Sequence, residues 1–373
     1  MQKKLNKTII SFLVLIAQII LFSVLFLSDN FIDFIVQRIT FPLSAFVAKM
    51  TNSVQLPLGD IFYLMIGILG FFLILRVIRS FFYKNRETSK SIYHLLIFVN
   101  SFYFIYIFAW GVMYKKDTLT FHQKEIAIQP KILKEIYCIE LDKAIIARNK
   151  IEHNDSTTTI QFKSNLNDYN EEFYSLQSSI KDLKWLKNYR LLENVHFKLS
   201  WISKMQNYMG ILGYYNPFTV EANLNRYNTN LKQPATLFHE YGHQMGFASE
   251  SEANFLAYYL GSKSKNPEIN YSIYYKSIYT LLGAIYKSDP YFVKMELNNM
   301  YPKIKLDRQA ELNHYLKYEG KASDTFSELN NQFLKANNQE GTISYNKYVE
   351  LIYILYQTKK RNQYRLHPKV WTD

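Results

Sequence analysis

The chain has 373 residues, of which 17% are aromatic, and a formal net charge of +13. Residues 1–116 hold twelve Lys and Arg against four Asp and Glu, so much of this charge adjoins apolar segments, where it orients a membrane protein. The chain shows no arginine-rich stripe and no reader motif, which argues against nucleic-acid binding. Its single cysteine, Cys138, excludes an intramolecular disulfide and a thiolate metal cluster, and the helical pattern around it predicts a small buried side chain.

Three apolar stretches come first, at about residues 8–27, 58–75 and 91–114. Each is close to the roughly 20 residues that a helix needs to cross a bilayer. We interpret the first as an uncleaved anchor, because its apolar run is longer than that of a signal peptide and no small-residue cleavage site follows it. Asn100, inside the third stretch, is predicted to hydrogen-bond a neighbouring helix.

Loop charges predict the orientation of these three spans. Three lysines lie within the first seven residues, and the loop between the second and third spans carries five Lys and Arg against one Glu. Positive loops stay in the cytoplasm, so the N-terminus is expected inside and everything after the third span outside. Residues 31–50 are predicted to form an amphipathic helix on the outer surface, broken at Pro42.

The sequence therefore predicts a multi-pass protein of the cytoplasmic (inner) membrane, in contact with the lipid bilayer. It would have a membrane domain over residues 1–116 and an extracytoplasmic domain, on the periplasmic side, over residues 117–373. The second domain is expected to be rich in α-helix, with short strands around residues 194–202 and 213–225 and a turn at Asn216–Pro217. From Pro234 onward, helices with short breaks are predicted.

The stretch "PATLFHEYGHQMGF" carries the clearest chemical signal. Pro234 suits the first turn of a helix, and Gly246 suits a left-handed residue that ends it. His239 and His243 are four residues apart and therefore share one face of that helix. Two imidazoles converging in this H-E-x-x-H pattern are typical of a zinc site, and Glu240 would take the proton from zinc-bound water and deliver it to a leaving amine.

The third metal ligand is expected just beyond this helix. Ser249 can cap a new helix, with Glu252 at the capping-box position, which leaves Glu250 free in the first turn to face the metal. Asn254, one turn beyond Glu250, can brace a metal-bound histidine. We therefore favour Glu250 as the third ligand over the alternative, Glu252.

The segment "ESEAN", residues 250–254, matches E-x-x-A-[DN] and resembles the ligand helix of glutamate-type zinc peptidases. Only six residues separate His243 from Glu250, however, whereas the familiar enzymes of that type insert far more. The start "HEYGHQMG" resembles the metzincin pattern, but Ser249 stands where that pattern requires a third histidine. The site therefore belongs wholly to neither pattern.

Together with "WGVMY", "GYYNPFTVEANLN" and "FLKANNQEGTISYNKYVELI", these residues resemble an uncharacterised bacterial membrane family, domain of unknown function 3810. The resemblance covers most of the chain, including the three spans. It implies a membrane-anchored, zincin-like metallopeptidase fold, mainly α with a small β element. It implies no particular substrate.

The favoured hypothesis is a zinc-dependent metallopeptidase that cuts peptide or protein substrates outside the membrane. The alternatives are a non-catalytic metal-binding scaffold in the envelope and a zinc hydrolase of a non-peptide envelope substrate. Residues 213–225 would supply an edge strand that pairs with an extended substrate or, equally, a core strand pair. Glu221 is expected to pair with a charge rather than bind the metal. Candidate donors to the oxyanion are Tyr214, Tyr215, His314 and Tyr345.

Overall fold

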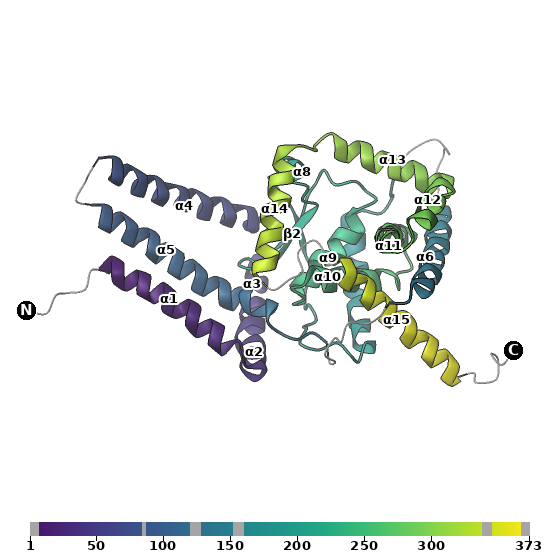
Figure 1. Cartoon of the computed structure of the whole chain (residues 1–373), viewed down its shortest axis with the longest axis horizontal. Helices are drawn as coiled ribbons and strands as arrows, with labels where there is room; N and C mark the ends of the chain where they lie inside the picture. The colour runs from purple at the N-terminus through teal and green to yellow at the C-terminus, as the bar shows by residue number, and fades with distance from the viewer. Residues whose placement is uncertain (1–6, 84–86, 120–127, 152–159, 338–344, 367–373) are drawn as a thin grey trace, which may run out of the picture. The chain divides into compact units, whose positions relative to one another are not determined.

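Tertiary contacts divide the protein into two compact units. In this computed structural model, the N-terminal unit comprises residues 1–118 and 216–221, and the C-terminal unit comprises residues 119–215 and 222–373 (Figure 1). The structure describes residues 7–83, 87–119, 128–151, 160–337 and 345–366.

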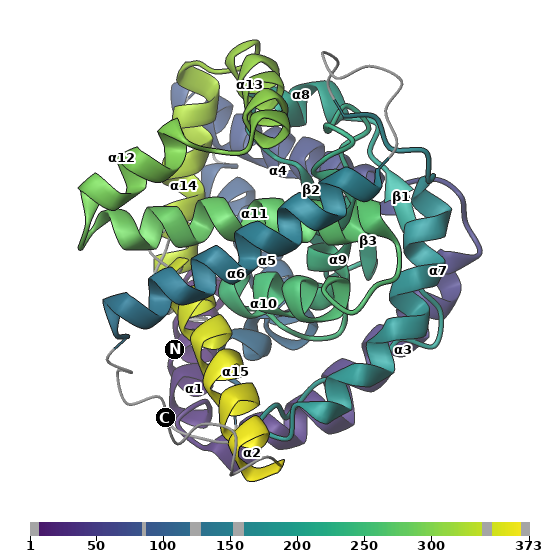
Figure 2. The ribbon, with the colours of Figure 1, turned by 90° about the vertical axis from the view of Figure 1, so that its right-hand side faces the viewer.

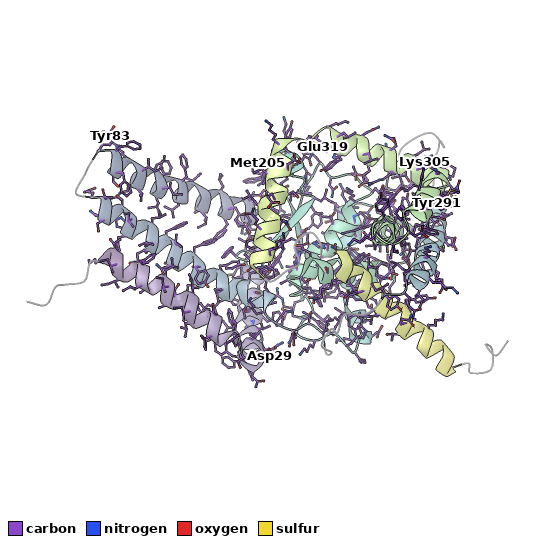
Figure 3. The ribbon with its side chains drawn as sticks, in the orientation of Figure 1. Asp29, Tyr83, Met205, Tyr291, Lys305 and Glu319 are labelled. Atoms are coloured by element: carbon purple, nitrogen blue, oxygen red, sulfur yellow. The ribbon has the colours of Figure 1, made fainter. Side chains whose placement is uncertain are left out.

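Apart from the segment 216–221, the regular structure in the described residues of the N-terminal unit is helical. α1, α4 and α5 run alongside one another, whereas α2 and α3 cross their ends (Figures 1 and 2). Asp29, at the start of α2, and Tyr83, which follows α4, lie at opposite ends of this bundle (Figure 3). The helices are α1 (Lys7–Leu25), α2 (Asp29–Ile35), α3 (Phe41–Asn52), α4 (Leu58–Phe82) and α5 (Thr88–Ala109), with a π-helical turn η1 (Val36–Thr40) and a 3₁₀ turn η2 (Gly111–Tyr114).

Four stretches of the described N-terminal unit are long and apolar enough to cross a membrane: α1, the continuous segment Asp29–Asn52, α4 and α5. In α4 no residue of the most apolar 18-residue window is buried within the protein. Such continuous apolar surface suits a lipid environment, and the predicted apolar helices that could span a membrane are confirmed. The segment Asp29–Asn52 is one candidate more than the three predicted.

This additional candidate contains the stretch that was expected to break at Pro42. The chain instead remains helical through it, because the turn before the proline widens into η1. Proline has no N–H and its ring crowds the preceding turn, and a π-helical turn accommodates both effects without ending the helix.

Polar contacts inside the N-terminal unit are few and specific. Asn100 Nδ2 donates to the carbonyl of Ser11 on α1 at 3.1 Å, which confirms its predicted role between helices. The segment 216–221 packs at the start of α4. Glu221 accepts from the backbone N–H of Gly59 at 2.6 Å, and the ring of Phe218 stacks on that of Phe62 with centroids 4.7 Å apart.

The C-terminal unit combines helices with one small sheet. The strand order is β1-β3-β2, and β1 pairs in parallel with the wholly buried β3, with Phe197 opposite Ala222 and Leu199 opposite Leu224. The elements are α6 (Pro130–Lys150), α7 (Leu166–Leu176), η3 (Gln177–Asp182), β1 (Phe197–Leu199), α8 (Ser203–Tyr208), β2 (Gly213–Asn216), β3 (Glu221–Leu224), α9 (Gln233–Gln244), α10 (Glu250–Gly261), α11 (Pro267–Tyr286), α12 (Pro290–Asn298), α13 (Pro302–Leu316), α14 (Lys321–Ala336) and α15 (Tyr345–Leu366).

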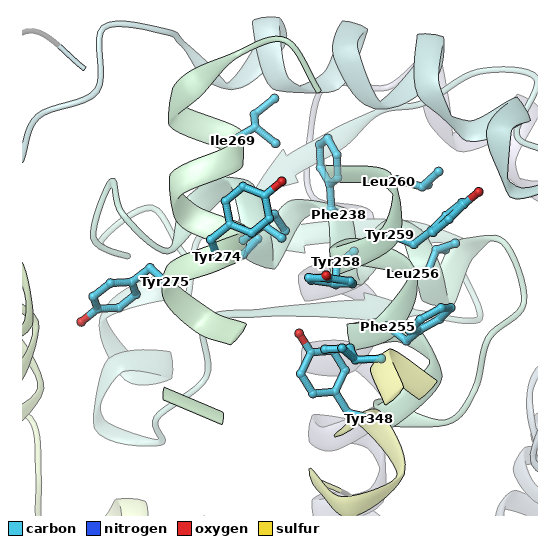
Figure 4. Close-up of a cluster of buried hydrophobic side chains, with 14 of the residues drawn as sticks. Phe238, Phe255, Leu256, Tyr258, Tyr259, Leu260, Ile269, Tyr274, Tyr275 and Tyr348 are labelled. Atoms are coloured by element: carbon cyan, nitrogen blue, oxygen red, sulfur yellow. The ribbon is translucent and has the colours of Figure 1, made fainter. Parts of the chain in front are cut away.

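The core of this unit is built largely from tyrosine and phenylalanine. Rings from α9, α10, α11 and α15 meet in one cluster that includes Phe238, Tyr258 and Tyr348 (Figure 4). The predicted mainly helical fold with a small β element is confirmed, and prolines begin α11 and α12 at two of the predicted breaks. Cys138 is exposed, so the prediction that it is buried was wrong. The buried face of α6 includes Tyr137, and Cys138, the next residue in the helix, points away from that face.

Candidate metal centre

α9 carries the histidine pair and has the predicted ends. Pro234 lies in its first turn, and Gly246, just beyond its last residue, has a φ of +104°, a conformation that residues with a Cβ avoid. His239 and His243 therefore lie one turn apart on the same face. Their Nε2 atoms are 3.1 Å apart.

Glu250 completes a triangle with the two imidazoles. Its Oε2 is 3.2 Å from His239 Nε2, and its Oε1 is 3.6 Å from His243 Nε2. In a tetrahedral zinc site with bonds near 2.0–2.1 Å, ligand atoms lie about 3.3–3.4 Å apart. The three side chains are therefore a group that could hold a metal ion, and the donor set of two imidazoles and one carboxylate suits zinc.

The close approach of α9 and α10 places Glu250 at this position. A Cβ on Gly242 would lie 3.1 Å from the Cα of Ala253, so only glycine allows the two helices to touch here without adjustment. α10 begins at Glu250, as predicted, but Ser249 makes no side-chain capping hydrogen bond. The approach of α9 to α10 therefore positions Glu250, without the predicted capping box.

The histidines are oriented differently by their surroundings. His243 Nδ1 is 2.7 Å from the carbonyl of Phe247 and donates to it, which leaves Nε2 as the ring nitrogen that faces the group. Among the described residues, His239 Nδ1 is buried without a hydrogen-bond partner. Asn254, expected to brace a histidine, instead accepts from Lys276 Nζ at 2.6 Å. The bracing group is thus a backbone carbonyl.

Burial and mutual charge shift the pKa values of the whole group. Burial lowers the pKa of His239 to about 4. Burial alone would also lower the pKa of His243, but Glu250 and Glu240 raise it to about 9. The two histidines hold the pKa of the Glu250 carboxyl well below its usual range against the opposing effect of burial. Burial also lowers the pKa of Lys276 to about 8.

Glu240 lies beside the triangle and next to the edge of the sheet. Burial raises its pKa to about 8, partly offset by His243. A Cβ on Gly213, the first residue of β2, would lie 3.1 Å from Glu240 Oε1. The absence of a side chain at Gly213 therefore leaves room for this carboxylate. The ring of Tyr215 lies 6.5 Å from that of His243.

The remaining candidates lie elsewhere. Glu252 is buried on α10 outside the metal group, and Glu221 belongs to the N-terminal unit, where it accepts from Gly59 N–H. His314 lies on α13, with its ring 5.4 Å from that of Tyr318. The side chain of Tyr345 is outside the described residues. Tyr215, one of the predicted oxyanion donors, has a ring contact with His243 of the metal group.

Lys276 and Gly213 are neighbours of the site that the sequence analysis did not identify. Lys276 reaches the site from α11 through Asn254, 22 residues earlier in the chain. Gly213 comes from the strand β2, 27 residues before Glu240. No local pattern signals either residue, because each is brought there by the packing of another element.

The fold and site define a mainly helical protein with N-terminal helices apolar enough to span a membrane and a His-His-Glu group that could hold a metal ion. Residues 37–353 match the protein family described as "Protein of unknown function (DUF3810)", and the chain belongs to this family. No curated protein and no solved structure matches the chain.

Proposed function

We propose that the protein is a zinc-dependent peptidase anchored in a lipid bilayer. The observation that carries this proposal is the triangle of His239, His243 and Glu250, with Glu240 adjacent to His239 on the same helix. A bound zinc ion would be held by the three triangle residues. Zinc, when bound, supplies a Lewis acid that activates water and polarises a carbonyl group.

Glu240 is suited to act as the general base. Burial raises its pKa to about 8, so its carboxylate is a stronger base than an exposed one, and a cation held by the neighbouring triangle would favour the ionised form that accepts a proton. The same carboxyl can then return the proton to the leaving amine. A peptide bond would thus be hydrolysed with one water molecule, yielding a carboxylate and an amine.

The edge strand β2 supports a peptide as the substrate. β2 lies at one edge of the sheet, and its residue Gly213 is next to Glu240. An extended peptide can add to such an edge through main-chain hydrogen bonds, which would bring its backbone to the carboxylate of Glu240. Tyr215, near His243 on the same strand, is our candidate donor to the developing oxyanion.

Metal analysis and hydrolysis of one set of purified proteins test this function. Full-length wild-type protein in nanodiscs is expected to hold about one zinc per chain and to cleave members of a peptide library, as followed by mass spectrometry. Glu240→Gln should keep the zinc and lose about 10²–10⁴-fold in hydrolysis. The matched control is Glu319→Gln, an exposed carboxyl distant in sequence from the motif, which should behave as wild type.

Three outcomes would redirect the proposal. Absence of zinc from the wild type would remove the metal centre, and undiminished hydrolysis by Glu240→Gln would remove that residue as the base. Bound zinc with no peptide cleavage would favour a metal-binding scaffold in the envelope or a hydrolase of a non-peptide envelope substrate. Retention of Glu240 argues for an enzyme, because a scaffold needs the ligands but not a base.

The proposed orientation places the N-terminus in the cytoplasm and the C-terminal unit outside, on the periplasmic side. It is supported by the positive loops and by the crosswise course of α2 and α3, which suits a helix at the membrane surface (Figures 1 and 2). Cys138, the single cysteine and an exposed one, provides the test. A membrane-impermeant maleimide should label it in right-side-out spheroplasts, whereas four crossings would protect it until the cells are lysed.

A further inference from the structure

A cavity of about 640 Å³ lies inside the C-terminal unit beside the metal centre. Its walls come from the start of α9, from one face of α11 and from α13. The volume falls within the range of about 300–1,000 Å³ that small-molecule and side-chain pockets occupy. Tyr275 lines this cavity, and Figure 4 shows its side chain pointing away from the other labelled core residues.

The cavity adjoins the candidate metal site, because residues on its wall neighbour Glu240 and Glu250. Thr236, on its wall, is one turn before Glu240 on the same face of α9. A Cβ on Gly213 would contact both of them, at 2.9 Å from Thr236 Cγ2 and 3.1 Å from Glu240 Oε1. Lys276, also on the wall, donates to Asn254 one turn beyond Glu250. A substrate at the metal centre would therefore extend a neighbouring group into this space.

The charged side chains on the wall are predominantly basic. Lys232, Lys276, Lys287 and Arg308 face a single acid, Glu311. Glu311 already accepts from Arg308 Nη1 at 2.6 Å and pairs with Lys232. Lys276 donates to the neutral amide oxygen of Asn254, and the carboxylates that act on its charge, Glu250 and Glu240, belong to the candidate metal site rather than to the cavity wall. A partly buried positive charge is stabilised further by an anion that reaches it from the cavity side.

The rest of the wall is apolar. Leu231, Ala235 and Ala284 line it together with the ring of Tyr279. Gly283 lies on the wall with no atom within 4 Å of the place where its Cβ would be, so a larger side chain there would enter open space. The cavity thus combines an apolar surface with a basic group, Lys276, next to the catalytic centre.

We propose that this cavity binds a carboxylate carried on an apolar stem, from the part of a peptide substrate next to the cleaved bond. The proposal rests on the proposed peptidase function for the choice of a peptide. The carboxylate can come from an acidic side chain or from the C-terminus of a short peptide. Lys276 recognises it, and the apolar wall packs against the stem.

Binding to metal-free protein tests the cavity without requiring hydrolysis. Full-length protein in neutral phosphatidylcholine nanodiscs, with EDTA present, is titrated calorimetrically with three peptides. These are acetyl-Phe-Glu-amide, acetyl-Phe-Gln-amide and acetyl-Phe-Gln with a free C-terminus. We expect at least one of the two carboxylate peptides to bind about tenfold or more tightly than the neutral one, and the one preferred identifies the source of the carboxylate.

Two substitutions assign that binding to the cavity. Lys276→Met should make the affinities for the carboxylate peptides and the neutral peptide nearly equal. Gly283→Leu should weaken the binding of all three peptides, because its side chain fills part of the cavity. Gly283→Leu replaces a mid-helix glycine in open space, so it should fold at least as well as wild type. Lys294→Gln removes an exposed lysine that does not line the cavity and should leave every affinity unchanged.

Equal affinity for the neutral and acidic peptides, or a carboxylate preference that survives Lys276→Met, would overturn the proposal. Binding unaffected by Gly283→Leu in a folded protein would do so as well. Because no metal and no turnover are involved, a peptide that binds here but is never cleaved by the zinc-loaded protein contradicts the peptidase function alone. Cleavage without any carboxylate preference contradicts the cavity proposal alone.

Discussion

Two buried polar clusters in the C-terminal unit differ in how completely their members satisfy one another. Arg148 on α6 binds Asp307 on α13 through Nε at 2.6 Å and Nη2 at 3.3 Å, and Tyr271 donates to the same carboxylate at 2.7 Å. The charges there are opposite and the carboxylate accepts from two side chains, although Arg148 Nη1 is buried without a partner among the described residues. At the metal centre two imidazole nitrogens face each other across 3.1 Å beside a carboxylate.

The difference is the one expected between a structural cluster and a group that could hold a metal ion. A buried carboxylate that accepts from several donors and faces its own cation needs no further cation. Two Nε2 atoms that converge with a carboxylate oxygen can share one cation, either a metal ion or, in the metal-free protein, a proton on His243, whose Nδ1 already donates to the carbonyl of Phe247. The predictions below test whether the Arg148–Asp307 cluster stabilises the fold and whether the histidine–glutamate cluster binds the metal.

The largest effect is expected from His243→Ala. This substitution removes one corner of the triangle, so bound zinc should fall from about one per chain to none, and hydrolysis should be lost with it. Metal analysis of the purified protein and circular dichroism give the two readouts. His314→Ala, a histidine on α13 outside the metal group, is the matched control and should retain zinc. Full zinc content in His243→Ala would contradict the assignment.

Arg148→Met should instead weaken the fold. It leaves Asp307 as a buried charge without its cation, which costs about 3–5 kcal/mol in the free energy of unfolding. Zinc per folded chain should remain unchanged. Chemical denaturation measures the loss, and the double variant Arg148→Met, Asp307→Leu should recover most of it, because two apolar groups replace the pair. A stability equal to wild type in the single variant would mean that the pair is not structural.

Zinc binding should depend on pH in a defined direction. In the metal-free protein Glu250 and Glu240 raise the pKa of His243 to about 9, so its imidazole is protonated at pH 7. Zinc requires the neutral ring, and binding therefore releases a proton. The apparent affinity should rise about tenfold per pH unit up to about pH 9 and then level off. Competition titration with a zinc chelator between pH 6 and 9 measures this slope, and a flat profile would contradict it.

A smaller effect is expected where α9 meets α10. Gly242→Val places methyl groups against Ala253, whose Cα lies 3.1 Å from the Cβ position, and should cost about 1–3 kcal/mol in stability. Displacement of α10 should also weaken zinc binding by moving Glu250. Thermal unfolding with and without zinc separates the two effects. Unchanged zinc affinity would show that α10 does not have to touch α9 to position its carboxylate.

The smallest effect is expected from Gly283→Ala, the matched control for Gly242→Val. Gly283→Ala also lies in the middle of a helix, but its new methyl group meets no atom within 4 Å. Stability should rise by roughly 0.5–1 kcal/mol, because alanine loses less conformational freedom than glycine on entering a helix. Zinc binding should not change. A loss of stability here would show that the two glycines do not differ in the way their surroundings indicate.

Local signals in the sequence predicted much of this architecture. Apolar runs marked helices that could span a membrane, and prolines marked the starts of α9, α11 and α12. These features depend on residues within a few turns of one another, which is why a single sequence reveals them. The course of Asp29–Asn52 across the bundle was harder to predict, because it depends on packing against other helices as well as on its own apolar residues.

By itself, the sequence determined that His239 and His243 share a helical face with Glu240 beside them, because a four-residue spacing brings side chains together in any α-helix. Tertiary structure decided which carboxylate joins them, since the approach of Gly242 to Ala253 brings Glu250 and leaves Glu252 outside. It also brought Lys276 from α11 to Asn254 and opened the cavity beside them. Contacts between distant segments arise from packing, and no spacing along one helix encodes them.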